Sequence, residues 1–304
     1  MKVTLLGTAA AEGWPALFCG CDACKVARHL GGRNIRTRSS ALIDDVLKID
    51  FPPDILSQVI QNGLDLRKLR AILFTHSHDD HCAPSELQYR GHYFVPKPVE
   101  DRLPIYGSVD VVDSILRVLS PDGTALDPDR FPLEFGILSP WVSAEIAGYT
   151  VIPVVANHDP NEDCFNYLVR DSEGATLLYA TDTGWYSGDT WDRLRQYTLN
   201  GVVIEATKGM QEDGYEGHLS IPQVIAFRRR LLDDGVVQKD TPFVTTHMSH
   251  LSGLLHDQMQ AILDPHNIRV GYDGMVFQVT ADTNRPDPTL QYAPPQLATL
   301  AETD

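Results

Sequence analysis

Short apolar runs rich in β-branched residues recur along the chain and alternate with stretches in which apolar positions follow the helical period. The runs predict strands at 3–6, 41–43, 46–49, 71–74, 150–155, 165–169, 176–179, 202–204, 243–245 and 275–279. The helical pattern predicts helices at 54–61, 111–119, 190–197, 221–232 and 253–263, with Ser220 as the N-cap of the fourth. Many strands and a few late helices favour two sheets packed face to face and covered by helices.

Two segments lack the regular pattern of strands and helices, and they suggest how the domain is organised. Residues 84–149 are irregular apart from the predicted helix at 111–119, and we interpret them as an insertion near the functional site. Residues 283–304 are rich in proline and polar residues, which predicts a tail. Because no internal repeat is visible, we expect one domain over residues 1–282.

Composition and charge narrow the class of protein. Of the 304 residues, 43% are hydrophobic and 22% are charged, which is typical of soluble globular proteins. The net charge of -16 argues against a nucleic-acid partner, since such partners select a basic surface. A phosphorylated substrate would need a local positive charge, such as a metal, to overcome this field.

The chain carries no pattern that predicts secretion or membrane insertion. Met1 leads directly into the first predicted strand, and no apolar run approaches the roughly 18 residues of a spanning helix. Five cysteines, three of them between positions 19 and 24, fit poorly with a disulfide framework in a chain of this length. We therefore expect a cytoplasmic protein without a membrane partner; its oligomeric state stays open, a homodimer being one option.

A dense group of potential metal ligands follows the apolar run at 71–74. The segment reads Thr75-His76-Ser77-His78-Asp79-Asp80-His81. In an extended backbone His76 and His78 point the same way, and Asp80 and His81 can supply a second metal after a turn. Imidazole and carboxylate suit zinc, manganese, iron or nickel, whereas a purely structural loop has no need of such crowding.

Three isolated residues of the same kinds appear downstream. His158, Asp182 and His247 each follow an apolar run that predicts a strand. One such residue alone would more often be a structural polar group. Because all three lie at predicted strand ends, as the first group does, they predict a single constellation.

This set resembles the ligand pattern of the metallo-β-lactamase superfamily, His-x-His-x-Asp-His followed by a later His, a bridging Asp and a final His. The resemblance implies two divalent metals, the first held by His76, His78 and His158 and the second by Asp80, His81 and His247, with Asp182 bridging them. It also implies an α/β fold of layered type, the four-layer αββα sandwich of that superfamily.

Both ends of the chain add a closer resemblance, to the cyclic-phosphate phosphodiesterase of bacterial phosphonate degradation. It rests on the glycine-rich start at 6–13, the run Cys19-Gly20-Cys21-Asp22-Ala23-Cys24, and the late segments 246–250 and 271–275. The resemblance implies one structural zinc held by Cys19, Cys21, Cys24 and His250, which is a chemically sound closed tetrahedral set. Cys82 and Cys164 lack ligand spacing and are interpreted as small buried hydrophobes.

Two comparisons of pattern refine this hypothesis. After the run at 46–49 the superfamily pattern has Asp then Gly, but this chain has Asp50-Phe51-Pro52-Pro53. The family of the cofactor-biosynthesis protein B of pyrroloquinoline quinone has a similar N-terminus, but its first metal motif is degraded. The intact motif here favours hydrolysis.

The expected activity is hydrolysis of a small, phosphorylated molecule, a (cyclic) phosphodiester, by a hydroxide that bridges the two metals. Asp80 would act as ligand and proton acceptor. His218 precedes the predicted helix at 221–232, where related phosphodiesterases place a histidine near the scissile phosphate; the alternative is a plain polar residue at a helix start. Other hypotheses stay open: hydrolysis of another ester, a lactone or a thioester, or a non-hydrolytic protein of cofactor biosynthesis.

Overall fold

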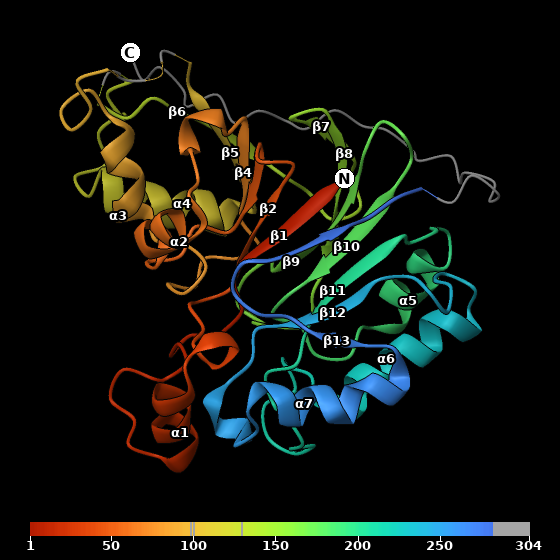
Figure 1. Ribbon diagram of the computed structural model, residues 1–304. Helices are drawn as coiled ribbons and strands as arrows, with labels where there is room; N and C mark the ends of the chain where they lie inside the picture. The colour runs from red at the N-terminus through yellow and green to blue at the C-terminus, as the bar shows by residue number, and fades with distance from the viewer. Residues whose placement is uncertain (98, 100, 129, 282–304) are drawn as a thin grey trace.

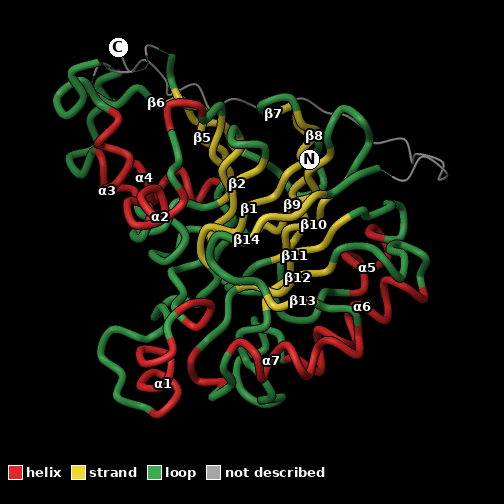
Figure 2. The backbone as a smooth tube through the Cα atoms, viewed as in Figure 1, coloured by secondary structure: helices red, strands yellow, loops and turns green. Residues whose placement is uncertain are grey.

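Two seven-stranded sheets stack face to face, and helices cover their outer faces (Figure 1). The computed structural model describes residues 1–281 apart from 98, 100 and 129. The order of layers is helix, sheet, sheet, helix, so the four-layer sandwich predicted from the sequence is confirmed (Figure 2). Within the described residues, no helix is both long enough and apolar enough to cross a membrane.

The first sheet has the strand order β14-β1-β2-β3-β4-β5-β6. Its strands are β1 (Lys2–Gly7), β2 (Ser40–Ile43), β3 (Leu47–Ile49), β4 (Ala71–Leu73), β5 (Leu103–Gly107), β6 (Leu133–Ile137) and β14 (Met275–Gln278). From β3 to β6 the neighbours are parallel, so these strands end at the same edge of the sheet.

The second sheet has the order β13-β12-β11-β10-β9-β8-β7. Its strands are β7 (Ala144–Ile146), β8 (Tyr149–Val155), β9 (Phe165–Arg170), β10 (Thr176–Ala180), β11 (Gly201–Glu205), β12 (Phe243–Thr246) and β13 (Arg269–Val270). From β10 to β13 the neighbours are parallel, which brings the ends of β10, β11 and β12 together.

Alternating side chains of each strand build three apolar layers. In β10, Leu177 and Tyr179 enter the core between the sheets, whereas Leu178 and Ala180 pack under the outer helices. This two-residue period is what a strand imposes when both of its faces are buried. It explains why β10 is apolar over residues 177–180 and β11 over residues 202–204, rather than alternating with polar residues.

Within the described part of the chain, seven α-helices lie outside the two sheets. They are α1 (Asp22–Leu30), α2 (Ile55–Asn62), α3 (Pro84–Leu87), α4 (Val109–Leu119), α5 (Gly188–Leu194), α6 (Ile221–Asp233) and α7 (His256–Leu263). Residues of α2 and α4 pack on the first sheet, and residues of α5, α6 and α7 on the second. As predicted, Ser220 caps α6, since its side chain accepts a hydrogen bond from the backbone N–H of Gln223.

The sequence predicted an irregular segment at 84–149, and this prediction is wrong because the segment has regular secondary structure. The segment holds α3, β5, α4, β6 and β7, and its strands extend the edges of both sheets. The apolar pattern missed β5 and β6 because Pro104 and Gly136 interrupt it; tertiary packing overrides those local preferences. The predicted tail at 283–304 lies outside the described residues.

An aromatic cluster under α6 generates a prediction about stability. The fully buried Phe227 ring lies 4.5 Å from the Trp191 ring, between ring centroids, and also packs on Tyr186. Replacing Phe227 with alanine leaves a cavity, so we expect Phe227→Ala to lower the free energy of unfolding by about 3–5 kcal/mol in urea titrations.

The matched control is Arg229→Ala on the exposed face of the same helix, which should change that free energy by no more than about 0.5 kcal/mol. Equal effects of the two substitutions would show that the cluster does not hold α6 on the sheet.

Candidate metal centre

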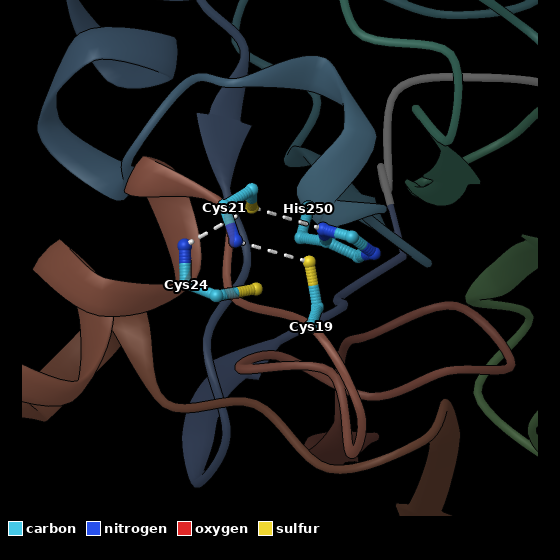
Figure 3. Close-up of side chains that lie close together, drawn as sticks. All are labelled: Cys19, Cys21, Cys24 and His250. Carbon is cyan, nitrogen blue, oxygen red and sulfur yellow. Dashed lines mark hydrogen bonds between the residues drawn. The ribbon is translucent and has the colours of Figure 1, made fainter.

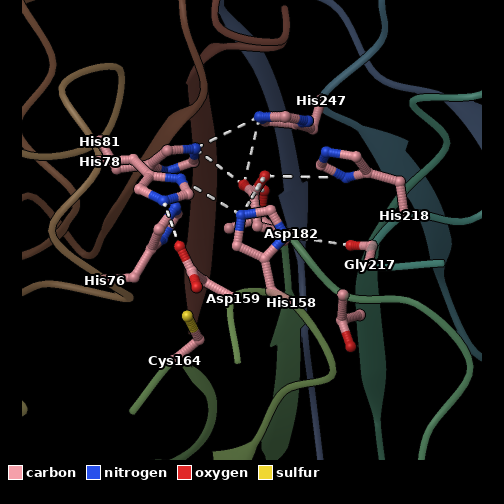
Figure 4. Close-up of polar contacts among 12 residues, drawn as sticks. His76, His78, His81, His158, Asp159, Cys164, Asp182, Gly217, His218 and His247 are labelled. Carbon is pink, nitrogen blue, oxygen red and sulfur yellow. Dashed lines mark hydrogen bonds and ion pairs between the residues drawn. The ribbon is translucent and has the colours of Figure 1, made fainter. Parts of the chain in front are cut away.

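The predicted ligands converge at the ends of strands from both sheets (Figure 4). The 75–81 loop follows β4, the loop with His158 follows β8, and Asp182 and His247 follow β10 and β12. The structure brings together all seven residues that the sequence singled out: His76, His78, Asp80, His81, His158, Asp182 and His247. Most of them are buried, so few waters can satisfy their polar atoms.

The first group consists of His76, His78 and His158, whose ligand atoms lie within 4.8 Å of one another. Nε2 of His158 is 3.3 Å from Nδ1 of His78. Nε2 of His76 is buried and has no hydrogen-bond partner among the described residues. Burial, together with the nearby His81, lowers the pKa of His76 well below its usual value, which keeps this imidazole neutral and its lone pair available.

The second group consists of Asp80, His81 and His247. Nε2 of His81 lies 3.3 Å from Nε2 of His247 and 3.2 Å from Oδ2 of Asp80. Asp182 stands between the two groups, since its Oδ2 is 2.8 Å from His81 Nε2 and its Oδ1 is 3.7 Å from His158 Nε2. One carboxylate therefore faces both groups, as expected for a shared ligand.

The electrostatics of this cluster favour a positive charge at its centre. Burial opposes ionisation of Asp80, but His81 and His247 hold the pKa of its carboxyl far below the usual range. Burial likewise opposes charge on His81, yet the carboxylates of Asp182 and Asp80 raise its pKa well above the usual value. Buried carboxylates need a counter-charge, and either a proton or a metal can supply it.

Hydrogen bonds fix which nitrogen of each imidazole faces the centre. His81 Nδ1 donates to Asp50 Oδ2 at 2.7 Å, and His158 Nδ1 donates to the carbonyl of Gly217 at 3.1 Å. The Thr207 hydroxyl donates to the carbonyl of His247, so it accepts from Nδ1 of the same residue at 2.8 Å. When these three rings are neutral, Nε2 of each is therefore left without a proton and points inward.

Hydrogen bonds also orient His76 and His78, but a different nitrogen faces the centre in each ring. The Thr75 hydroxyl donates to Asp50 and therefore accepts from His76 Nδ1 at 2.9 Å, leaving Nε2 free. His78 instead turns Nε2 toward Asp159 Oδ2 at 3.3 Å, which leaves Nδ1 facing the centre. Hence all five imidazoles present a lone pair to the same small volume.

Asp50 and Glu205 are functional residues that the search for ligands missed. Asp50 holds His81 and accepts hydrogen bonds from the backbone N–H and hydroxyl of Thr75. The chain has Asp50-Phe51 after β3, where the superfamily pattern has Asp then Gly. Asp50 itself adopts a left-handed φ of 58°. The backbone N–H of Phe51 then donates to the carbonyl of His81, at the end of the 75–81 loop, which is called the metal loop below. Both acidic residues directly follow a predicted strand, which is the pattern that identified the ligands.

Glu205 is fully buried at the end of β11 and ties together the loops that follow β10 and β11. Its carboxylate accepts from the backbone N–H groups of Thr183, Thr207 and Leu219, at 2.8, 3.2 and 3.0 Å. It also accepts from Nδ1 of His218 at 2.8 Å. Thus one side chain fixes the loops after β10 and β11 and orients His218.

His218 lies beside the cluster, as the sequence suggested. Its ring stacks on His247 with centroids 5.6 Å apart, and its Nδ1 is 3.8 Å from Oδ1 of Asp182. Its other nitrogen faces the cluster (Figure 4). Burial lowers the pKa of His218, but Glu205 outweighs this effect and raises the pKa to about 9.

The three N-terminal cysteines and His250 form a second, separate cluster (Figure 3). Cys21 caps α1, and its Sγ lies 3.5 Å from Nδ1 of His250 at the start of the short helix η4 (His250–Ser252). The backbone N–H of Cys24 and the imidazole of His250 lower the pKa of Cys21 to about 6. All five cysteines are free thiols, and Cys82 and Cys164 are buried as predicted.

Two curated relatives share the name coenzyme PQQ synthesis protein B. The protein from Azoarcus sp. is 25% identical over 319 residues, covering 92% of this chain and 100% of the relative. The protein from Methylobacterium radiotolerans is 32% identical over 127 residues, and there the alignment covers only 38% of this chain and 40% of the relative.

Solved structures extend the comparison to the fold. A diphosphatase from the PhnP family superposes with a TM-score of 0.71 and 21% identity over 92% of this chain and 99% of its own. Zinc-bound PqqB from Methylobacterium extorquens superposes with a TM-score of 0.68 and 19% identity, over 91% and 100%. A family model described as a beta-lactamase superfamily domain matches residues 46–264, more than half of the chain. The chain therefore belongs to the β-lactamase superfamily and has the metallo-β-lactamase fold.

Proposed function

We propose that this protein is a metal-dependent hydrolase with two divalent metals at the cluster around Asp182. The observation that carries the proposal is the set of five imidazole lone pairs aimed at one volume, including the unpartnered Nε2 of buried His76. Nitrogen atoms 3.3 Å apart that lack protons repel one another, and cations between them remove that repulsion. Imidazole and carboxylate donors suit zinc, manganese, nickel or iron.

A structural zinc at Cys19, Cys21, Cys24 and His250 is the second part of the proposal. Three thiols and one imidazole form a closed tetrahedral set, and the lowered pKa of Cys21 favours the thiolate that zinc binds. Glu12 lies 3.6 Å from Nε2 of His250, on the side away from the thiols, and can orient the ring. Since His250 is three residues from His247, this zinc would hold one end of the dinuclear site in place.

The reaction we propose is hydrolysis of a small phosphodiester. When bound, two divalent metals at such a site activate water and neutralise charge on the phosphoryl oxygens. Asp182 holds the two ligand groups at a fixed spacing, and Asp80 is both a ligand and a nearby proton acceptor. His218, held by Glu205, can donate a proton to the departing oxygen from the nitrogen that faces the cluster.

Hydrolysis of a phosphorylated substrate is favoured over other hydrolyses by the likeness to the PhnP-family diphosphatase. A second candidate is a role in cofactor biosynthesis, which the full-length alignment with coenzyme PQQ synthesis protein B from Azoarcus supports. The complete ligand set around Asp182 supports the hydrolytic role, because two metals there would suit the activation of water. A substrate screen with phosphodiesters, lactones and thioesters separates them.

Metal analysis tests the dinuclear site. We expect His76→Ala to lose metal from the cluster and to abolish hydrolysis of bis(p-nitrophenyl) phosphate, while circular dichroism shows an intact fold. The exposed His266→Ala is the control and should keep metal content and turnover. Wild-type protein that is active with no metal beyond one thiolate-bound zinc would contradict the proposal.

The zinc proposal makes a separate prediction about stability. Cys24→Ala should remove one zinc per chain and lower the melting temperature, because the energy of metal binding is also folding energy. Cys164→Ala, which alters a thiol outside the cluster, should leave the zinc content unchanged. The proposal fails if both variants retain the same zinc as the wild type.

Leaving groups of different basicity test His218. A general acid contributes about 10²–10⁴-fold in rate, and only where the leaving oxygen needs a proton. His218→Ala should therefore slow the hydrolysis of alkyl phosphodiesters by about that factor. It should slow the hydrolysis of p-nitrophenyl esters far less, and the metal content should not change. Equal losses on the two kinds of ester would leave His218 without a role as an acid.

A further inference from the structure

A second cavity lies away from the metal centre, between the first sheet and the segment that follows the metal loop. It has a volume of about 230 Å³, and its walls are mostly apolar, with Phe51, Leu66, Leu69, Leu87 and Leu103 among them. An apolar cavity of about 150 Å³ accommodates benzene. The cavity therefore has room for one substituted ring or a short acyl chain.

The polar residues of this cavity are mostly cationic, although the protein is acidic as a whole. Among the described residues, Arg67, Arg90 and Lys97 line it together with one carboxylate, that of Glu86. Arg67 is already paired with Asp65, at 2.7 and 2.8 Å. This leaves Arg90 and Lys97 as the positive groups that can meet a ligand.

Arg90 is the half-buried cation of this lining. One terminal nitrogen donates to the backbone carbonyl of Asp101 at 2.6 Å. Partial burial lowers the pKa of Arg90, and an anion beside the guanidinium would favour its charged form. An anion is also the acceptor that binds a guanidinium most strongly.

The cavity shares a wall with the metal loop but not its ligands. The backbone N–H of Phe51 donates to the carbonyl of His81 at 2.7 Å, and the N–H of Ala83 donates to the carbonyl of Phe51 at 2.9 Å. The side chain of Phe51 lines the cavity, whereas His81 points into the metal cluster. A ligand here would therefore lie behind the metal loop, outside the reaction site.

We propose that this cavity binds a small amphiphilic anion, with an apolar ring or short chain against the leucines and a carboxylate or phosphate at Arg90. The apolar walls fit the body of such a molecule, and Arg90 and Lys97 fit its charged end. The occupant is a free small molecule, because a cavity of about 230 Å³ holds one short chain and not a lipid. The proposal does not depend on which reaction the metal centre performs.

Isothermal titration calorimetry of the full-length, metal-loaded protein tests whether the cavity binds such an anion. The probes are octanoate, octanamide and octylamine, which share a chain length and differ in charge. We expect octanoate to bind at least about tenfold more tightly than the other two, a difference of about 1.4 kcal/mol. Leu66→Trp, which adds a bulky ring to the wall of the cavity, should abolish binding of octanoate. Arg90→Met should reduce it to the level of octanamide, whereas Arg117→Met, an exposed arginine on α4, should change nothing.

Several outcomes would overturn the proposal. They are the absence of octanoate binding to the wild type, equal binding of all three probes, or octanoate binding that survives both Leu66→Trp and Arg90→Met. Binding that disappears in His76→Ala and persists in Leu66→Trp would place the anion at the metal centre instead. Co-sedimentation with phosphatidylglycerol vesicles that is lost in Leu66→Trp would identify a membrane lipid as the occupant, against the proposal.

Discussion

The rest of the site depends on one electrostatic constraint, which is that two buried carboxylates and five imidazole lone pairs face the same small volume. Asp80 and Asp182 stay ionised in spite of burial because the neighbouring histidines compensate their charge. Without a metal at the centre, that compensation requires a protonated imidazole, and the carboxylates of Asp182 and Asp80 raise the pKa of His81 well above its usual value. Metals satisfy the same constraint and use every lone pair at once.

The fold meets this constraint through the ends of its parallel strands. Asp50 and His247 stand directly after strands and Asp182 one residue further on; they adopt left-handed φ angles of 58°, 54° and 49°, respectively. Each such residue costs of the order of 1–3 kcal/mol and turns the chain sharply enough to direct its side chain inward. Glu205 then accepts hydrogen bonds from three backbone N–H groups in the loops after β10 and β11, which holds these loops against each other.

The candidate ligands could be predicted from the sequence because each is marked by its immediate neighbours along the chain. Four of them lie between His76 and His81, and the other three each follow an apolar run that forms a strand. Asp50 and Glu205 occupy equivalent positions, but their function lies in hydrogen bonds to distant backbone and imidazole groups, which no local pattern records. Strands β5 and β6 escaped prediction for a related reason, since Pro104 and Gly136 are tolerated only because the neighbouring strands and helices supply the packing.

The central claim is that Asp182 is shared between two metals, and anomalous diffraction from crystals of the purified protein tests it most directly. The account predicts two anomalous peaks on opposite sides of the Asp182 carboxylate, one against His76, His78 and His158 and the other against Asp80, His81 and His247. A single peak, or none, at this cluster in crystals of active protein would contradict it.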